Sequence, residues 1–350
     1  MQVPASPRRS IRRVAAVAIA ALVASGLAAV APPQVAPVPA AQAAAVCDTA
    51  KGGKRFYPGD DSSRTYNGTF RNSRGIDHFL DDYVPQGLGV WHDWNGGTED
   101  LFLIGMHHED ESKGDDASDA SEPRGLVYGI STFTGAFRGY MYLPKGAHSG
   151  GLKTYQSGKK QWLYVQQNPG RLSRYDLSTV RAAFRGTGTR TPTPASIKVD
   201  QNISFLDIRG KKLFGGKFNS SGRDWMYRWT IKANGTLSRD TSFKKQVPKK
   251  AQGLVVLSDT YVFSTSSGRN NRGNIYVTRK NYTKNFEDTR YKCFAAPVLS
   301  QELVDYGAGV FLSFEGGADY FDGNFPWTTA DNKIKNLHRA STTTLRNFVY

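Results

Sequence analysis

The sequence predicts an all-β fold made of five repeated sheets, and three observations lead to it. Short runs of β-branched and aromatic residues occur in groups of three, and the groups recur along the chain at a spacing of about fifty residues. Gly, Asn and Asp separate the runs, as expected of turns between short strands. No run shows sustained helical periodicity, although residues 177–184 are a candidate for one short helix.

Each group supplies three predicted strands in the same order. The first strands are 86–90, 150–152, 203–206, 252–256 and 301–304. The second strands are 101–104, 162–165, 213–216, 261–264 and 310–313. The third strands are 126–128, 172–175, 225–229, 274–277 and 334–337. Four groups have a fourth run directly before the next group, at 140–143, 196–199, 242–244 and 291–294. The unit is therefore a four-stranded antiparallel blade, and five blades predict a five-bladed β-propeller.

The fifth group is shorter than the others. After residue 337 only 341–350 remain to supply its fourth strand. A strand from the N-terminal segment can close such a ring instead, and residues 55–57 or 65–71 are candidates. A closed ring leaves no exposed sheet edge. In this repeat architecture residues 84–341 resemble β-propeller proteins, and a resemblance of fold implies no particular activity.

The first 43 residues are typical of a secretion signal peptide. Four arginines between residues 8 and 13 precede an apolar run, 14–30, and residues 41–43 (Ala-Gln-Ala) match an A-x-A cleavage site. The apolar run is shorter than the roughly 20 residues of a membrane span. We therefore expect residues 1–43 to be removed on export by the general or twin-arginine route, with an uncleaved anchor as the alternative. Residues 44–83 then lead into the ring, and 84–350 form it as a secreted, soluble monomer.

The chain without this signal carries 42 Lys and Arg against 30 Asp and Glu, a formal charge of +12. Such an excess favours polyanions, for example an anionic polymer of the cell envelope, an acidic polysaccharide or a nucleic acid. The basic residues are spread along the sequence, which is more typical of a solvated surface than of a binding stripe. No motif specific to nucleic-acid binding is present in the sequence.

Both cysteines, Cys47 and Cys293, lie beyond the predicted signal. An even pair in an exported chain predicts a disulfide, with free buried thiols as the alternative. In the entropic model, closing a loop of this length stabilises the fold by roughly 4 to 5 kcal/mol. The bond would tie the start of the mature chain to the outer strand of the fourth blade. No Cys and His spacing typical of structural zinc occurs in the sequence.

Residues 109–122 contain seven acids and no apolar anchor, between the second and third strands of the first blade. This composition predicts a solvated loop. Calcium binding is the alternative, but the acids do not follow the spacing of a known calcium-binding loop.

The repeat also predicts where a ligand would bind. In a propeller the first strands line the central channel, and strand direction alternates, so the start of strand one and the end of strand two open on the same face. The residues at the starts of the first strands are Gln86, His148, Asn202 or Ser204, Gln252 and Glu302. Those at the ends of the second strands are His107, His108, 166–168, Lys217, Asn219, Ser266 and Glu315. Because buried polar groups need partners, this polar ring predicts a ligand site, with a water-filled channel as the alternative.

Candidate roles follow from the chemistry of these side chains. The candidate ligand-binding residues are Gln86, His148, Gln252, Lys217 and Asn219, with Lys217 pairing with an anionic group. His107, His148 and Glu302 are candidate ligands of a divalent metal, and an ordinary hydrogen-bonded histidine pair is the alternative. The candidate catalytic residues are His148, His107, Glu302 and Glu315, of which the two glutamates form a possible carboxylate pair for glycoside cleavage.

The tryptophans fall into two predicted groups. Trp162, Trp225 and Trp229 lie in strands and are expected in the core between blades. Trp91, Trp94 and Trp327 lie in Gly- and Asp-rich loops and are candidates for a contact surface.

The leading interpretation is an exported propeller that binds a carbohydrate-type or anionic envelope ligand at the channel mouth. A secreted hydrolase or lyase that uses the His/Glu cluster, with or without a divalent metal, is the second. An extracellular scaffold for protein interactions is the third. The sequence contains no nucleophile-elbow serine, Gly-rich phosphate loop or HExxH motif, so neither a reaction nor a ligand is named by a motif.

Overall fold

A computed structural model describes residues 46–109, 124–145, 147–167, 169–322 and 329–350. The predicted signal peptide, 1–43, and the acidic loop beyond Glu109 lie outside the described residues. The described residues belong to one compact unit.

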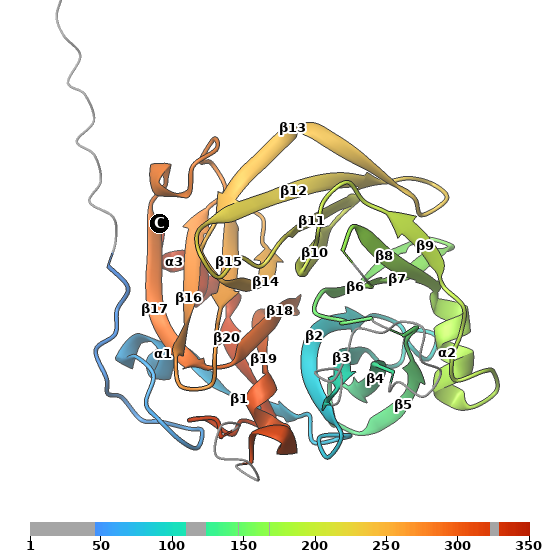
Figure 1. The fold of residues 1–350 in the computed structure, drawn as a ribbon, viewed down its shortest axis with the longest axis horizontal. Helices are drawn as coiled ribbons and strands as arrows, with labels where there is room; N and C mark the ends of the chain where they lie inside the picture. Colours follow the sequence, from blue (N-terminus) through green and yellow to red (C-terminus); the bar gives the residue numbers. More distant parts are fainter. Residues whose placement is uncertain (1–45, 110–123, 146, 168, 323–328) are drawn as a thin grey trace, which may run out of the picture. The chain divides into compact units, whose positions relative to one another are not determined.

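Five four-stranded antiparallel sheets surround a central axis, and each sheet is one blade (Figure 1). Blade one consists of β2 (Tyr83–Trp91), β3 (Leu101–His108), β4 (Leu126–Ser131) and β5 (Phe137–Tyr142). Blade two consists of β6 (Leu152–Ser157), β7 (Lys160–Gln166), β8 (Arg171–Asp176) and β9 (Ala195–Lys198). Blade three consists of β10 (Phe205–Arg209), β11 (Lys212–Gly216), β12 (Asp224–Ile231) and β13 (Leu237–Val247).

Blades four and five complete the ring. Blade four consists of β14 (Ala251–Val256), β15 (Thr260–Thr265), β16 (Arg272–Arg279) and β17 (Tyr291–Val298). Blade five consists of β18 (Ser300–Tyr306), β19 (Gly309–Phe314), β20 (Asn336–Ser341) and β1 (Phe70–Gly75). The predicted five-bladed propeller with four-stranded antiparallel blades is therefore confirmed.

The N-terminal segment closes the ring, as predicted, by adding β1 to the outer edge of β20. The strand begins later than expected, because residues 64–69 form a helix, α1 (Arg64–Thr69), whose first turn is capped by Ser63 Oγ accepting from Tyr66 N at 3.1 Å. The chain end supplies no strand. Instead, Ser341 caps a short C-terminal helix, α3 (Thr342–Asn347).

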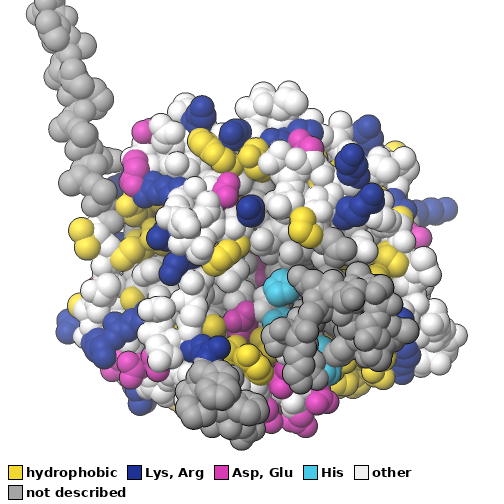
Figure 2. Space-filling model, in the orientation of Figure 1, with side chains coloured by type: hydrophobic (Ala, Val, Ile, Leu, Met, Phe, Trp, Pro, Cys, Tyr) yellow, Lys and Arg dark blue, Asp and Glu magenta, His cyan; other side chains and the backbone are white. Residues whose placement is uncertain are grey.

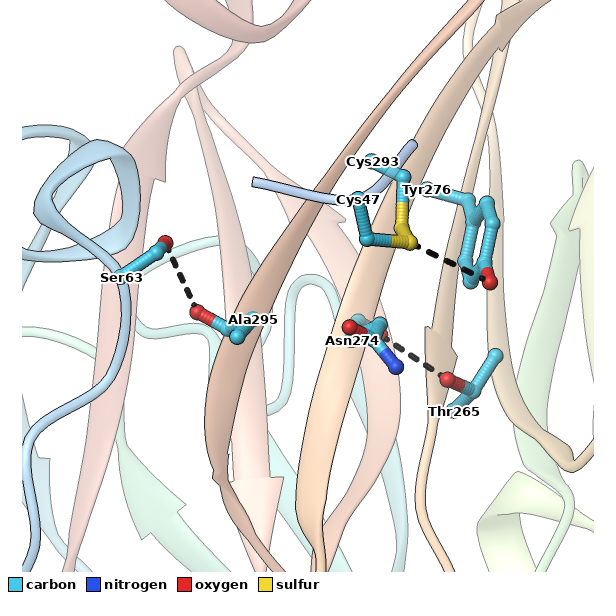
Figure 3. Close-up of a disulfide and its surroundings, with 7 residues drawn as sticks. All are labelled: Cys47, Ser63, Thr265, Asn274, Tyr276, Cys293 and Ala295. Atoms are coloured by element: carbon cyan, nitrogen blue, oxygen red, sulfur yellow. Dashed lines mark hydrogen bonds between the residues drawn. A yellow bond between two sulfur atoms is a disulfide. The ribbon is translucent and has the colours of Figure 1, made fainter. Parts of the chain in front are cut away.

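The predicted disulfide between Cys47 and Cys293 is present, with the two Cα atoms 4.4 Å apart (Figure 3). It lies beside a short bridge between the N-terminal segment and β17. In this bridge Asp48 N donates to Cys293 O at 2.8 Å, and Ala295 N donates to Asp48 O at 2.8 Å. Ser63 Oγ also donates to Ala295 O, at 3.0 Å. The bond therefore fastens the segment that carries β1 to the neighbouring blade.

Hydrophobic clusters lie between neighbouring blades, one at each of the five blade interfaces. The interface of blades one and two is extended by α2 (Leu177–Arg185), the predicted helix, which ends at Gly186 in a left-handed conformation (φ 71°). Trp91 and Trp94 are buried under this helix, so their expected role as a contact surface is wrong. Trp327 lies outside the described residues. Trp162 and Trp229 are core residues, as predicted, whereas Trp225 is partly exposed.

Three short 3-10 helices occur in loops, η2 (Phe286–Asp288), η3 (Glu315–Gly317) and η4 (Asp319–Phe321). Among the residues that the structure describes, no helix is long and apolar enough to span a membrane.

Candidate functional site

A cavity of about 610 Å³ opens at one end of the inner strands. Its walls come from all five blades and from η4. The lining residues are Val84, Gln86, His107, Glu109, His148, Gly150, Ser204, Phe218, Gln252, Glu315, Tyr320 and Phe321. Figure 2 shows histidine and acidic side chains close together near the centre of one face. Six residues of the predicted polar ring line this cavity, namely Gln86, His107, His148, Ser204, Gln252 and Glu315.

A smaller cavity of about 290 Å³ opens at the other end of the same strands. Gln86 and Val90 of β2 lie at different cavities, as do Gln252 and Val256 of β14. The five inner strands therefore run in the same direction along the axis. The first cavity, where they start, is called the entry cavity below, and the second is called the exit cavity.

Two glutamines reach the entry cavity from β-bulges. In β2, Pro85 pairs with Met106 and Gly87 with the preceding residue, Gly105, so Gln86 is the extra residue. In β14, Gln252 is extra between Ala251 and Gly253 in the same way. A bulge redirects the side chain of the extra residue, here toward the cavity. The glycine after each glutamine is required, because a Cβ on Gly87 would lie 2.2 Å from Ser149 O and one on Gly253 would lie 2.6 Å from Gln301 O.

The same kind of bulge explains the placement of Glu302. Ser300 pairs with Phe314 and Leu303 with Leu312, so β18 carries one extra residue between them. Gln301 bonds to Glu315 at the entry cavity, and Glu302 turns to the axis of the ring. At the entry cavity, blade five therefore places Gln301 against Glu315, whereas the alternation of the sequence predicted Glu302 there.

His107 and His148 face each other across the boundary of blades one and two. Their rings stack with centroids 5.0 Å apart and an interplanar angle of 18°. Burial, with smaller contributions from His148 and His108, lowers the pKa of His107 to about 3. Its imidazole is therefore neutral at physiological pH. Nδ1 of His107 is buried and has no hydrogen-bond partner among the protein groups that the structure describes.

Glu315 follows the end of β19 and forms part of the cavity wall. Gln86 Nε2 donates to Glu315 Oε1. Burial raises the pKa of Glu315 to about 7, although the charge of His148 and hydrogen bonds from Gln86 and Gln301 oppose the rise. This carboxyl group is therefore able to hold or release a proton near neutral pH.

Six lining residues were not among the predicted site residues, namely Val84, Gly150 and four with polar or aromatic side chains. Glu109 accepts a hydrogen bond at 2.9 Å from the backbone N of Tyr320. Tyr320 and Phe321 come from η4, and Phe218 follows the end of β11. Glu109 begins the acidic stretch that we predicted to be a solvated loop, and only its position directly after His107 and His108 pointed to the cavity. The aromatic residues lie beyond the strand ends, where the repeat makes no prediction.

Lys217 and Asn219 do not line the entry cavity with the other residues of the predicted ring. β11 ends at Gly216, so the side chain of Lys217 is exposed at the rim. Asn219 shapes the following turn. Its Oδ1 accepts from Ser221 N at 2.9 Å and from Gly222 N at 3.1 Å, and its Nδ2 donates to Asp224.

Glu302 belongs to a buried charge cluster on the axis. Lys153 Nζ lies 3.4 Å from Glu302 Oε1 and donates to Leu88 O at 2.7 Å and Leu303 O at 2.9 Å. Glu302 Oε1 also accepts from Leu254 N at 3.1 Å. Asp207, nearby in blade three, accepts from Val256 N at 2.7 Å. The cluster connects all five blades, and Lys153 and Asp207 also line the exit cavity.

The predicted metal ligands are not brought together. His107 and His148 stack at the entry cavity, whereas Glu302 pairs with Lys153 on the axis. Across the described ranges, no group of three or more His, Cys, Asp or Glu side chains is arranged to hold a metal ion. Because Glu302 pairs with Lys153 on the axis, Glu302 and Glu315 do not form the expected carboxylate pair in one cavity. The second carboxylate in the described lining of the entry cavity is instead that of Glu109.

Comparison with known proteins gives similarity of fold only. No protein-family model and no curated protein matches the chain. The chain is similar to the crystal structure of a glutaminyl cyclase from Myxococcus xanthus, with 10% identity and a TM-score of 0.44, over 78% of this chain and 97% of that one. It is also similar to a GH43 β-xylosidase/α-arabinofuranosidase from a compost microbial metagenome, solved with xylotriose in a calcium-free form, with 12% identity and a TM-score of 0.45, over 74% of this chain and 92% of that one. Similarity at this level assigns no activity to the chain.

Proposed function

We propose that this protein is exported and binds a carbohydrate-type ligand, through an uncharged sugar unit, in the entry cavity. The composition of the lining carries this proposal. Amide, hydroxyl and imidazole groups converge from the blades, and Phe218, Tyr320 and Phe321 add aromatic surface. Sugar hydroxyls both donate and accept hydrogen bonds, and the C–H faces of a sugar ring pack on aromatic side chains.

The size and charge of the cavity support the same ligand class. A volume of about 610 Å³ lies within the usual range of small-molecule sites. Glu109 and Glu315 line it, and no Lys or Arg occurs among the described lining residues. An anionic group inside the cavity would lie near these two carboxylates, with no described Lys or Arg of the lining to bind it. Nδ1 of the lining residue His107, which has no protein partner in the described part of the chain, would gain a partner from a polyhydroxylated ligand.

Export rests on the arginine and apolar pattern of residues 1–43 and on the disulfide. Sequencing of the N-terminus of protein recovered from the medium checks it. A chain that still begins at Met1 would contradict cleavage.

Gln252→Ala is expected to weaken binding of a neutral oligosaccharide about three- to tenfold, because it removes one amide from the cavity. A neutral ligand is first selected from an oligosaccharide array, and its affinity is then measured by isothermal titration calorimetry. Gln156→Ala is the matched control, because Gln156 is also a partly buried glutamine of an inner strand but lies at the exit cavity. Equal losses in both variants, or no loss in Gln252→Ala, would contradict binding in the entry cavity.

Hydrolysis of a bound glycoside is a second candidate function, favoured by the raised pKa of Glu315, about 7, and by Glu109 in the same cavity. In this role a protonated Glu315 donates its proton to the leaving oxygen. The rate is therefore expected to fall as the pH rises through about 7, since the acid form is lost.

Glu315→Gln is expected to lower the hydrolysis rate on aryl glycosides about 100-fold or more, as removal of a general acid does. Asp305→Asn is the matched control, because burial also raises the pKa of Asp305, which lies at the exit cavity. If no glycoside in the panel is cleaved, or if the Glu315 variant keeps the full rate, the protein is a binding protein rather than a hydrolase.

A further inference from the structure

Blade three carries an unusual excess of positive charge. Residues 201–250 contain twelve Lys and Arg against three Asp and Glu. These twelve basic residues are spread along fifty positions of the sequence, but all of them lie in or next to the strands of one sheet, β10 to β13. In Figure 2 Lys and Arg side chains appear along the edge of the molecule where Figure 1 shows β12 and β13.

Lysines rather than arginines leave this charge uncompensated. Each of the four arginines in this range pairs with an acid: Arg209 with Asp305, Arg223 with Glu287, Arg228 with Asp240 and Arg239 with Asp200. None of the eight lysines in the range forms an ion pair with a described Asp or Glu within 4.0 Å. The net charge of the blade is therefore presented to solvent by ammonium groups.

Part of this charge lies directly beside the entry cavity. Lys217 precedes Phe218, and Lys250 is two residues before Gln252, and both Phe218 and Gln252 line the cavity. Lys250 N donates to Asn219 O at 3.0 Å, so the segment with Lys249 and Lys250 lies against the segment with Lys217. Lys217 and Lys249 are exposed. We call Lys217, Lys244, Lys249 and Lys284, together with Trp225, the lysine rim.

Trp225 adds an aromatic group to the rim. It is the second residue of β12, whose first residues lie at the same end of the blade as the end of β11. Lys244 Nζ lies 4.3 Å from the centre of the Trp225 ring, and Lys284 Nζ lies 5.7 Å from it. A partly exposed indole near two ammonium groups is suited to a sugar unit that carries a negative charge.

We infer that the ligand is an acidic polysaccharide, with an uncharged sugar unit in the entry cavity and the adjoining carboxylate-bearing units across the lysine rim. The inference rests on the proposed function of the cavity. The described lining of the cavity includes carboxylates and no Lys or Arg, whereas the rim offers four lysines, so one ligand with both kinds of unit satisfies both surfaces. A nucleic acid fits less well, because stacking of successive bases needs successive aromatic rings and the rim has one.

The test uses the Lys217→Gln/Lys249→Gln double variant. The matched control is Lys211→Gln/Lys232→Gln, which removes the same charge from exposed lysines of the same blade. These two lie in the turns after β10 and β12, at the exit end. Binding of hyaluronan and gellan oligosaccharides, which both contain neutral as well as carboxylate-bearing sugar units, is measured by titration calorimetry at two salt concentrations. The rim variant is expected to bind about three- to tenfold more weakly, with a smaller salt dependence, whereas the control stays within twofold.

Equal losses in the two double variants would show general charge attraction and overturn the inference, as would no rim-dependent binding of either polysaccharide. A single-stranded oligonucleotide that binds more tightly than both, with the same dependence on the rim, would replace the polysaccharide as the ligand. Gln252→Ala separates this inference from the proposed function. If it weakens binding of neutral oligosaccharides while the rim variant has no effect, only the inference fails. If Gln252→Ala has no effect on any sugar, the proposed function fails.

Discussion

Lys153→Met is expected to lower the free energy of unfolding by about 3 to 5 kcal/mol, the usual cost of breaking a buried ion pair. The Lys153 ammonium group is buried and contacts Glu302 and two backbone carbonyls, from β2 and β18. Methionine retains the apolar stem but leaves the Glu302 carboxylate and both carbonyls without their cation. Urea denaturation at pH 7 measures the loss.

Two further variants show whether the charge pair is the cause. Lys153→Met/Glu302→Gln is expected to be more stable than Lys153→Met alone, because it leaves no buried charge unpaired at this point. Lys160→Met, on the exposed start of β7, should change stability by no more than about 0.5 kcal/mol. A loss in Lys153→Met that the second substitution does not reduce would mean that packing, not charge, accounts for it.

The same cluster makes stability depend on pH. Burial raises the pKa of Glu302 to about 7 and that of Asp207 to about 6, both above their values in the unfolded chain. The folded state therefore binds more protons than the unfolded chain between about pH 4.5 and 7. The favourable contribution of these two groups to the free energy of unfolding is consequently lost as the pH rises through 6 to 7. Lys153→Met is expected to lower the free energy of unfolding less at pH 5 than at pH 8, because Glu302 is neutral at pH 5. Unfolding curves at the two pH values check this.

Removal of the disulfide has the other large expected effect. Cys47→Ala/Cys293→Ala should lower the free energy of unfolding by about 2 to 5 kcal/mol, because a link across 246 residues restricts the unfolded chain. The bond also holds the N-terminal segment against β17, where Asp48 bridges the backbone of Cys293 and Ala295. Urea denaturation with and without a reducing agent measures the effect.

The reducing agent supplies the control for the disulfide. It should destabilise the native chain by about the same amount as the double substitution and leave the double variant unchanged. An unaltered mobility of the native protein on non-reducing gels after reduction, or equal stability of the two proteins, would contradict the bond.

The repeat predicted the fold and about half of the site, and particular residues explain the rest. Gln86 and Gln252 were placed correctly because the repeat positions the start of each inner strand. Glu302 was misplaced because a bulge adds one residue to β18, which reverses the direction of the side chain. A bulge depends on contacts with the neighbouring strand, and alternation along one strand does not show it.

The tryptophans illustrate a second limit. Trp91 and Trp94 precede a turn with several glycines and looked exposed, but α2 from the next blade covers them, and Arg181 lies over both rings. Trp225 has the pattern of a core strand but lies at the start of β12, where the outer strands reach solvent. Burial of an aromatic residue in a ring of blades depends on which blade faces it, and this is not local information.

The pairing of β1 with β20 has a consequence for the order of folding. Phe70 lies opposite Ala340, so the outermost strand of the last blade is made long before the strand with which it pairs. The ring cannot close until β20 has been synthesised, and until then the edge of β1 must avoid other partners. Pairing over such a distance along the chain slows folding and prolongs exposure to aggregation. Chains truncated shortly before β20 should therefore remain open, with blade five incomplete and the N-terminal strand without its partner.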